Sequence, residues 1–85
     1  MMYEVRFSPR AQRDLRSLSA QVVQRVLPRI EALSNEPRPQ GSKKLSGDKN
    51  VWRIRIGNYR AVYTIEDSIR IVEIRRVGDR KDIYL

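Results

Sequence analysis

The chain has 85 residues, a net charge of +8 at pH 7, and neither cysteine nor histidine. This length predicts one small domain, residues 1–85. The missing cysteines exclude disulfides and thiolate metal sites, and the missing histidines exclude Ser-His-Asp and Cys-His catalysis. No apolar run is long enough to cross a membrane and the N-terminus has no signal-peptide pattern, so we expect a cytoplasmic protein without a metal or cofactor.

The positive charge is concentrated in the second part of the chain. Residues 1–36 carry six Lys/Arg against four Asp/Glu, whereas residues 37–85 carry twelve against six. A basic domain favours polyanionic partners, nucleic acid first, because its cations neutralise phosphates and release counterions. The charge alone would also fit a solvated surface without a specific target, an acidic protein partner or an anionic membrane.

The first third of the chain predicts a strand followed by two helices. Residues 3–7 alternate apolar and charged side chains, as a strand does. Ser8 and Pro9 are typical of an N-cap and a first helical position, so a helix should extend over residues 10–18. Ser19 begins a second helix, which has an apolar stripe at 3.6-residue spacing. Two helices joined so tightly should form an antiparallel hairpin.

The second helix contains Pro28. Proline removes one backbone hydrogen bond and clashes with the preceding turn, so we expect a kink near residues 24–27 and not a break. The helix should end by Glu36, because two prolines follow. Residues 37–50 are mostly turn formers and lysines, which predicts a surface loop with Leu45 as its single anchor in the core.

The centre of the chain predicts a β-hairpin. Residues 51–56 alternate apolar side chains with arginines, residues 57–58 are the turn signal Gly-Asn, and residues 59–66 are rich in β-branched and aromatic side chains. One face should build the core, with Trp52 in it, and Tyr59 and Tyr63 should pack in the core or across the strands. The other face should display a compact cationic surface formed by Arg53, Arg55 and Arg60.

The last part of the chain predicts an interior strand and a short tail. Residues 67–68 form a turn, residues 69–77 are apolar on both faces at their middle, and residues 78–79 end the strand. The tail that follows could add a final bridge or lie across the sheet. The order β-α-α-β-β-β defines an α+β domain, with an antiparallel-dominated sheet and the N-terminal helical hairpin packed on one face.

The sequence lacks most of the usual catalytic constellations. It has no P-loop, no GxGxxG and no carboxylate pair spaced for metal or acid–base work. An enzyme built from this chain must therefore work by positioning and by cationic stabilisation of a phosphate, together with a tyrosine. Plainer interpretations stay open, with Arg53 and Arg55 as solvated strand residues and Arg80 paired with Asp79 or Asp82.

Four motifs carry a resemblance to a known family. They are Lys-Leu-Ser-Gly at 44–47, the block from Trp52 to Tyr63, Val-Gly-Asp-Arg at 77–80, and Tyr84. With the β-α-α prefix, they make the chain similar to the RelE/ParE toxin family of bacterial type II toxin–antitoxin systems, RelE (mRNA interferase) branch. The resemblance implies a RelE-like microbial RNase fold and a metal-independent endoribonuclease. Such an enzyme cleaves mRNA in the ribosomal A site by attack of the 2′-hydroxyl, giving a 2′,3′-cyclic phosphate.

The resemblance also implies the site. The family's catalytic positions match Arg53, Arg55, Arg60, Arg80 and Tyr84, and the further residues expected to bind RNA are Lys43, Lys44, Lys49, Arg76 and Lys81. Well-studied RelE enzymes have lysines on the central strand, and many relatives have histidine at position 79. An arginine has a pKa of roughly 12.5–13.8 and cannot serve as an efficient general base, so we assign Arg53 and Arg55 to holding the phosphate. Arg80 would contact the leaving group, and Tyr84 would orient the attacked nucleotide.

The partners implied by the resemblance are a cognate antitoxin, the 30S A site of the ribosome with its mRNA, and operator DNA reached through the antitoxin; no membrane is expected. Two alternatives share the fold: a ParE-like inhibitor of DNA gyrase, and a non-catalytic RNA- or ribosome-binding module. Arg80 and Tyr84 favour the nuclease, because a gyrase binder has no evident need for them.

Overall fold

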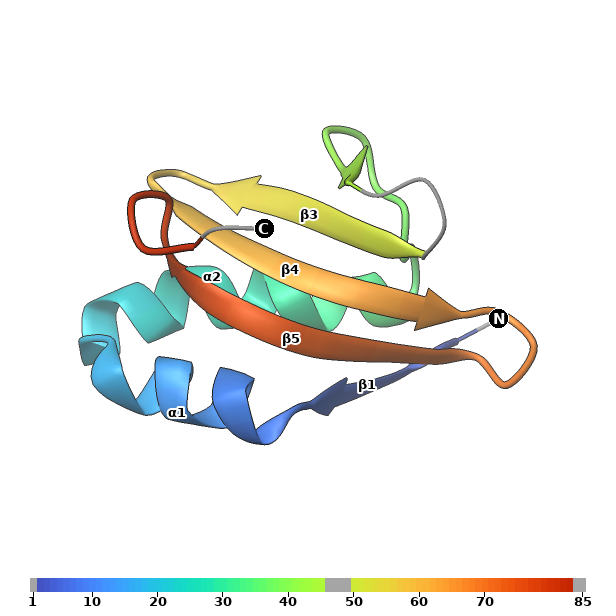
Figure 1. Cartoon of the computed structure of the whole chain (residues 1–85), viewed down its shortest axis with the longest axis horizontal. Coiled ribbons are helices and arrows are strands. Elements are labelled where there is room, and N and C mark those ends of the chain that lie inside the picture. Colours follow the sequence, from blue (N-terminus) through green and yellow to red (C-terminus); the bar gives the residue numbers. More distant parts are fainter. Residues whose placement is uncertain (1, 46–49, 84–85) are drawn as a thin grey trace.

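The computed structural model describes residues 2–45 and 50–83. Its elements follow the predicted order, with one short extra strand before the central hairpin (Figure 1). They are β1 (Glu4–Phe7), α1 (Pro9–Ser17), α2 (Ala20–Glu31), the 3₁₀ turn η1 (Ala32–Ser34), β2 (Lys43–Lys44), β3 (Val51–Ile56), β4 (Tyr59–Glu66) and β5 (Ile71–Asp79). In the described part of the chain, no helix is long and apolar enough to cross a membrane.

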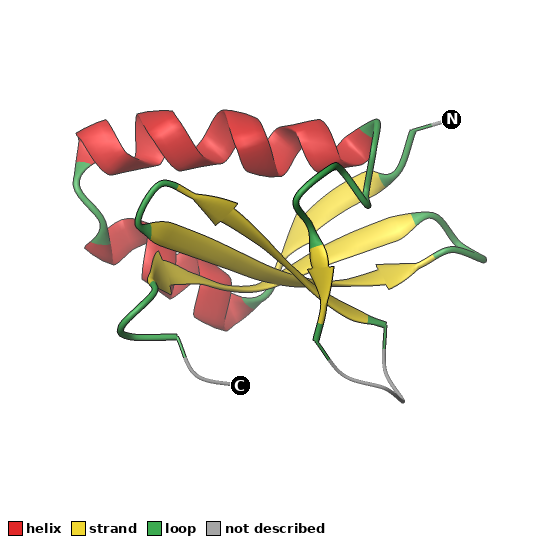
Figure 2. Ribbon diagram, turned by 90° about the horizontal axis from the view of Figure 1, so that it is seen from above, coloured by secondary structure: helices red, strands yellow, loops and turns green. Residues whose placement is uncertain are grey.

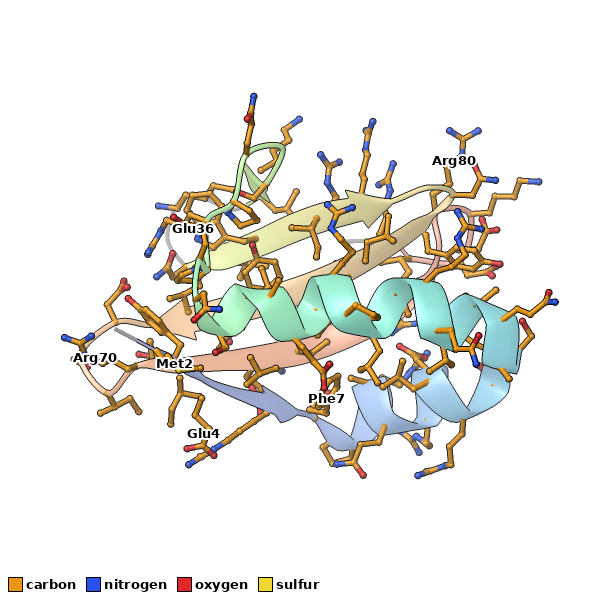
Figure 3. All side chains as sticks on the ribbon, turned by 180° about the vertical axis from the view of Figure 1, so that it is seen from behind. Met2, Glu4, Phe7, Glu36, Arg70 and Arg80 are labelled. Atoms are coloured by element: carbon orange, nitrogen blue, oxygen red, sulfur yellow. The ribbon has the colours of Figure 1, made fainter. Side chains whose placement is uncertain are left out.

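The five strands form one sheet in the order β1-β5-β4-β3-β2. β1 and β5 pair in parallel, and the other neighbouring strands pair antiparallel. Seen from behind, both helices lie in front of the sheet, whereas the opposite face carries no helix of the described chain (Figures 2 and 3). The structure therefore confirms an α+β fold with an antiparallel-dominated sheet and a helical hairpin on one face. The opposite side of the sheet is called the open face below.

Both helices begin at the serines that the sequence indicated. The Ser8 hydroxyl accepts a hydrogen bond from the Ala11 amide at 3.1 Å, and the Ser19 hydroxyl accepts one from the Val22 amide at 3.3 Å. Each of these bonds satisfies an N–H group that has no partner inside the helix. α2 continues through Pro28 to Glu31, so the expected absence of a break is confirmed.

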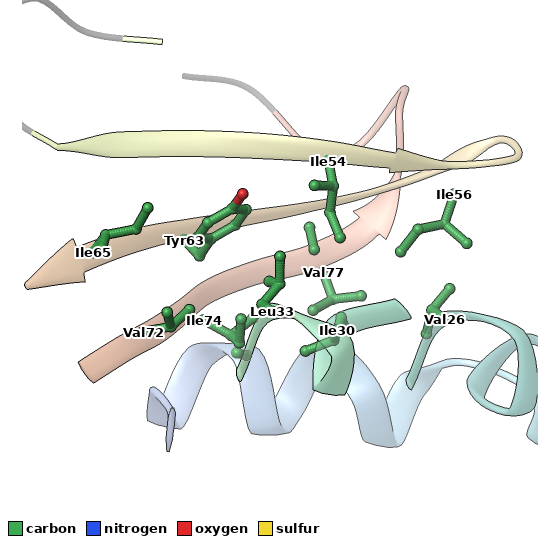
Figure 4. Close-up of a cluster of buried hydrophobic side chains, with 12 residues drawn as sticks. Val26, Ile30, Leu33, Ile54, Ile56, Tyr63, Ile65, Val72, Ile74 and Val77 are labelled. Atoms are coloured by element: carbon green, nitrogen blue, oxygen red, sulfur yellow. The ribbon is translucent and has the colours of Figure 1, made fainter. Parts of the chain in front are cut away.

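The core lies between the helices and the sheet (Figure 4). Its most completely buried side chains come from α2, η1 and the three long strands; they are Tyr63, Ile30, Leu33, Ile54, Ile65, Ile74, Val26, Val72 and Val77. Along β3 and β4, alternate side chains point toward the helices, and these are the core residues of the two strands. Tyr63 is in the core as predicted, whereas Trp52 and Tyr59 are only partly buried against it. The Arg38 guanidinium covers the Trp52 ring at 5.3 Å from its centroid.

The segment before β3 differs from the predicted surface loop. It contains β2, which pairs antiparallel with β3, and its buried anchor is Pro37, whereas Leu45 is only half-buried. The reason is the hydroxyl of Tyr63, which is buried in the core and must find a partner. That hydroxyl donates a hydrogen bond of 2.7 Å to the Pro37 carbonyl and so fixes the start of the segment.

β5 begins and ends two residues later than predicted, at Ile71 and Asp79. The turn before it extends over residues 67–70, has Arg70 at φ 54, and leaves Ile69 63% exposed. The strand is interior, as expected, since it lies between β1 and β4. An irregularity opposite Val62 and Tyr63 shifts the register of β5 and changes which of its side chains face the core.

Candidate functional site

Three arginines of the central hairpin lie together on the open face. Arg55 is directly opposite Arg60 across the β3–β4 ladder, and residues opposite each other in a sheet share a face. Arg53 is two residues from Arg55 on the same strand and therefore on the same side. Arg53, Arg55 and Arg60 form the arginine cluster, as the alternation of the sequence predicts.

Arg53 is buried, which corrects the expectation that the hairpin displays all three guanidinium groups. Only 8% of Arg53 is exposed, because β3 is flanked on both sides, with Lys43 of β2 opposite Arg53 on one side and Val62 of β4 on the other. Burial lowers the pKa of Arg53, and the charges of Arg55 and Arg60 lower it further. Alternation predicted the face correctly but could not predict that β2 would pair with β3 and place Lys43 beside Arg53.

The arginine cluster has unused hydrogen-bond donors. The Nε atoms of Arg53 and Arg60 are buried and have no partner among the described residues. A buried donor without a partner is costly, and a buried cation without a counter-charge more so. The ordinary remedy for such a group is an anion, and the planar guanidinium matches the oxygens of a phosphate particularly well.

No ion pair of the described residues reaches the arginine cluster. The ion pairs of the described residues join Glu4, Asp14, Asp67 and Glu73 to other arginines, and none includes a member of the arginine cluster. Asp79 lies opposite Tyr59 in the β4–β5 ladder, next to the pair that contains Arg60, and its Oδ1 accepts the Lys81 amide at 2.9 Å. The cluster therefore keeps its full positive charge on the open face.

The segment after β5 completes this end of the sheet. The Arg80 amide donates to the Asn58 carbonyl at 3.0 Å, which places Arg80 beside the turn between β3 and β4. Ile83 is 5% exposed, and a Cβ built on Gly78 would be 3.3 Å from its Cδ1 atom. Gly78 is opposite Arg60 in the ladder, so the tail as far as Ile83 folds back onto the open face, as in the second of the two predicted arrangements. Tyr84 lies outside the described residues.

The predicted RNA-binding residues do not share one face of the sheet, and one of them is bound in an ion pair. Lys43 is opposite Arg53 and shares its face, whereas Lys44 is opposite Trp52 and points to the other side; both are exposed, as is Lys81. Arg76 is held by α1, with its Nε 2.9 Å from Oδ2 of Asp14. Lys49 lies outside the described residues.

Two features of the site region escaped prediction from sequence. Asp14 Oδ2 also accepts a hydrogen bond from the Val77 amide at 3.0 Å. β1 pairs with β5 only as far as Ile74, so Asp14 provides the acceptor that β1 does not provide at Val77. Asp14 is the only acidic residue of α1, which was an available signal. Val62 and Ile83 are both buried but belong to no part of the main core cluster, and Ile83 rests against Gly78 instead. For Ile83 the sequence signal was an apolar residue that directly follows the three charged residues 80–82.

A hollow of about 530 Å³ lies on the same face, away from the arginine cluster. Acidic and basic side chains both line it, and Arg6 and Arg75 are each paired with a neighbouring glutamate. The unsatisfied cationic donors are therefore in the arginine cluster and not in this hollow. The hollow is lined by Arg6, Asn50, Thr64, Glu66, Ile69, Ile71, Glu73 and Arg75.

Comparison with known proteins shows the protein family to which the chain belongs. Residues 5–84 match the family described as ParE toxin of type II toxin-antitoxin system, parDE. The chain is 36% identical over 85 residues to toxin RelG of Mycobacterium tuberculosis, covering 99% of this chain and 98% of the relative. It is 31% identical over 87 residues to a putative toxin RelE1 of Methanocaldococcus jannaschii, covering 99% and 97%.

Solved structures agree with the sequence relatives. The toxin–antitoxin complex RelBE2 of Mycobacterium tuberculosis contains a chain that matches with a TM-score of 0.82 and 34% identity, covering 94% of this chain and all of that one. The RelE–RelB complex of Pyrococcus horikoshii matches with a TM-score of 0.82 and 27% identity, covering 98% and 100%. The fold and the family match define a toxin of a type II toxin–antitoxin system. The chain belongs to the RelE/ParE toxin family, and the relatives reported above are named as toxins RelE1 and RelG.

Proposed function

We propose that this toxin is a ribosome-dependent mRNA endonuclease that inhibits translation by cleaving mRNA in the ribosomal A site. The observation that carries the proposal is the arginine cluster. It provides permanently charged donors, two of them buried and without a partner among the described residues, on a face that no described helix covers. Preorganised donors of this kind stabilise charge that develops at a phosphate during reaction.

The proposed reaction is an internal transfer at one phosphodiester. The 2′-oxygen attacks phosphorus while the bond from phosphorus to the 5′-oxygen breaks, giving a 2′,3′-cyclic phosphate and a 5′-hydroxyl. Arg55 and Arg60, opposite each other across the hairpin, hold the non-bridging oxygens and stabilise the pentacoordinate charge. Arg53 supports them from its buried position, and Arg80 is assigned to the leaving-group side.

Proton transfer is the step for which this cluster is poorly suited. Arginine stays protonated at neutral pH even where burial lowers its pKa, so Arg53 is no efficient base. We assign the transfer of the 2′-hydroxyl proton to the leaving 5′-oxygen to water or ribosomal RNA, with Tyr84 orienting the nucleotide. This division of labour makes cleavage dependent on the ribosome and independent of a metal ion.

The proposed partners follow from charge and from the solved relatives. Two similar toxins are seen in complexes with their antitoxins, the RelBE2 and RelE–RelB complexes above. We propose a cognate antitoxin for this chain as well, with an acidic and apolar segment that covers the cationic open face in the cytoplasm. Contact with operator DNA would come through that antitoxin.

The test is expression of the chain alone in bacteria, followed by mapping of mRNA 5′ ends. Cuts inside translated codons, lost in an Arg60→Ala variant, are expected. Purified ribosomes with mRNA and EDTA should give the same cuts, and naked RNA should give none at a useful rate. The match to a ParE family favours one rival, inhibition of DNA gyrase. DNA-damage signalling and blocked gyrase without mRNA cuts would refute the nuclease in favour of that rival.

A further inference from the structure

Arg25 of α2 lies against the tip of the central hairpin. Its Nη2 atom is 2.9 Å from the position that a Cβ of residue 57 would occupy. Residue 57 is glycine with φ 61, so no side chain fills that space. The contact is supported from the core, where Val26 of α2 and Ile56 at the end of β3 are both buried at the same end of the cluster (Figure 4).

The hairpin turn thus has two reasons to contain glycine. A positive φ at the first central position, without one at Asn58, is characteristic of a type II′ turn, which prefers glycine there. The second reason is the close approach of the Arg25 guanidinium. A side chain at residue 57 would push Arg25 away from the hairpin tip.

Arg25 has no acidic partner among the described residues. It takes part in none of the ion pairs of the described chain, and its side chain is exposed. The same tip carries Arg55 and Arg60, which flank the turn on the open face, and Arg80, whose amide is bound to Asn58. Four arginines gathered around one turn repel each other, which indicates a polyanionic ligand that follows the tip from one side to the other.

We propose that Arg25 binds a phosphate of the RNA backbone that neighbours the phosphate held by the arginine cluster, so that the strand crosses the tip of the hairpin. This inference rests on the proposed function and adds to it a contact outside the reacting phosphodiester. Arg25 lies against the turn, so an RNA strand that leaves the arginine cluster across the tip of the hairpin meets its guanidinium. It reads the backbone and not the base, because a guanidinium on a phosphate carries no sequence information.

The experiment uses the full chain and single-stranded RNA oligonucleotides that carry 2′-O-methyl groups and cannot be cleaved. Fluorescence anisotropy gives the affinity at several salt concentrations, for oligonucleotides lengthened one nucleotide at a time. The variants are Arg25→Gln, Arg25→Lys and Arg55→Ala, with Arg29→Gln as the matched control. Arg29 is an exposed arginine one turn further along α2. Circular dichroism and thermal unfolding check that each variant is folded.

We expect Arg25→Gln to weaken binding about tenfold at low salt, the value of one charge-assisted contact. The slope of log affinity against log salt should fall by about 0.7, as for one phosphate of a single strand. The loss should appear only once the oligonucleotide is long enough to pass the tip, and Arg25→Lys should restore the slope. Arg29→Gln should change neither quantity by a comparable amount.

Two results would overturn the inference, and they differ in what they say about RNA binding by the arginine cluster. If Arg55→Ala weakens binding while Arg25→Gln behaves like Arg29→Gln, Arg25 is no phosphate contact and the proposed function is untouched. If the wild-type chain binds none of the oligonucleotides even at low salt, this inference fails together with the expectation that the arginine cluster binds free RNA, whereas the proposed function is decided by mRNA cleavage on ribosomes.

Discussion

The contact between Gly78 and Ile83 predicts a strong coupling between two small substitutions. Gly78→Ala places a Cβ 3.3 Å from Cδ1 of Ile83 and 3.4 Å from its Cγ1. The distance to Cδ1 is shorter than an ordinary van der Waals contact, whereas the distance to Cγ1 is an ordinary contact. Ile83→Val removes only the Cδ1 atom. The Gly78→Ala change should therefore be unfavourable in the wild-type chain and acceptable in the Ile83→Val background.

The magnitudes follow from the packing. Replacing a strand glycine with alanine gains about 0.5–1 kcal/mol in backbone entropy, while overpacking a buried contact costs about 1–3 kcal/mol. Gly78→Ala alone should then lower the free energy of unfolding by about 0.5–2 kcal/mol. Ile83→Val alone should lower it by about 0.5–1.5 kcal/mol. In the double variant the overpacking is relieved, so the two effects should depart from additivity by about 1–2 kcal/mol.

Urea unfolding followed by the fluorescence of Trp52, the single tryptophan of the chain, measures all four proteins. The same cycle tests whether the tail is anchored on the open face, because only an anchored Ile83 can couple to Gly78. Additivity within about 0.5 kcal/mol would show that Ile83 does not rest on Gly78, and the described path of the tail would be wrong.

Three further predictions concern the packing around the sheet. Tyr63→Phe should lower the free energy of unfolding by about 1–3 kcal/mol in a urea titration, because it leaves the buried Pro37 carbonyl without its 2.7 Å donor; an unchanged value would contradict this hydrogen bond. Arg38 and Tyr3 lower the pKa of Asp67 to about 2, below its unfolded value of 3.8, so its contribution to stability is complete above that value and is lost as the pH falls toward 2. Thermal unfolding of Asp67→Asn should therefore lose part of its dependence on pH in that range, and an unaltered profile would refute the role of this carboxylate. Asp14→Asn should cost about 1.5–3 kcal/mol in chemical denaturation, since Asp14 binds both a guanidinium and a backbone amide; a loss no larger than that of a typical surface substitution would argue against this bridge.

Local chemistry explains why much of the fold could be predicted from the sequence. The caps at Ser8 and Ser19 act within one helical turn, so they are visible in a few residues. The alternation along β3 sets the faces of the hairpin, and the Gly57-Asn58 turn sets its register. These signals placed Arg55 and Arg60 on one face before any tertiary contact was known.

Features that depend on distant contacts could not be predicted in this way. Arg53 is buried because β2, a two-residue strand in a polar segment, pairs beside it. β5 changes register opposite Val62, and no residue type in β5 signals that irregularity. Arg25 joins the hairpin tip only because α2 packs beside β3, and no local pattern along the chain groups it with the arginines of the hairpin.

The central claim is that the arginine cluster stabilises a transition state and does more than attract RNA. Single-turnover cleavage of mRNA on programmed ribosomes, at saturating toxin and with affinity measured separately, tests it most directly. Arg55→Ala and Arg60→Ala should each lower the rate of cleavage by about 10²–10³-fold with a much smaller change in affinity. Arg13→Ala, which removes an exposed arginine of α1, is the charge-matched control and should leave the rate nearly unchanged. Small and equal effects at all three positions would contradict the claim and reduce the cluster to a docking surface.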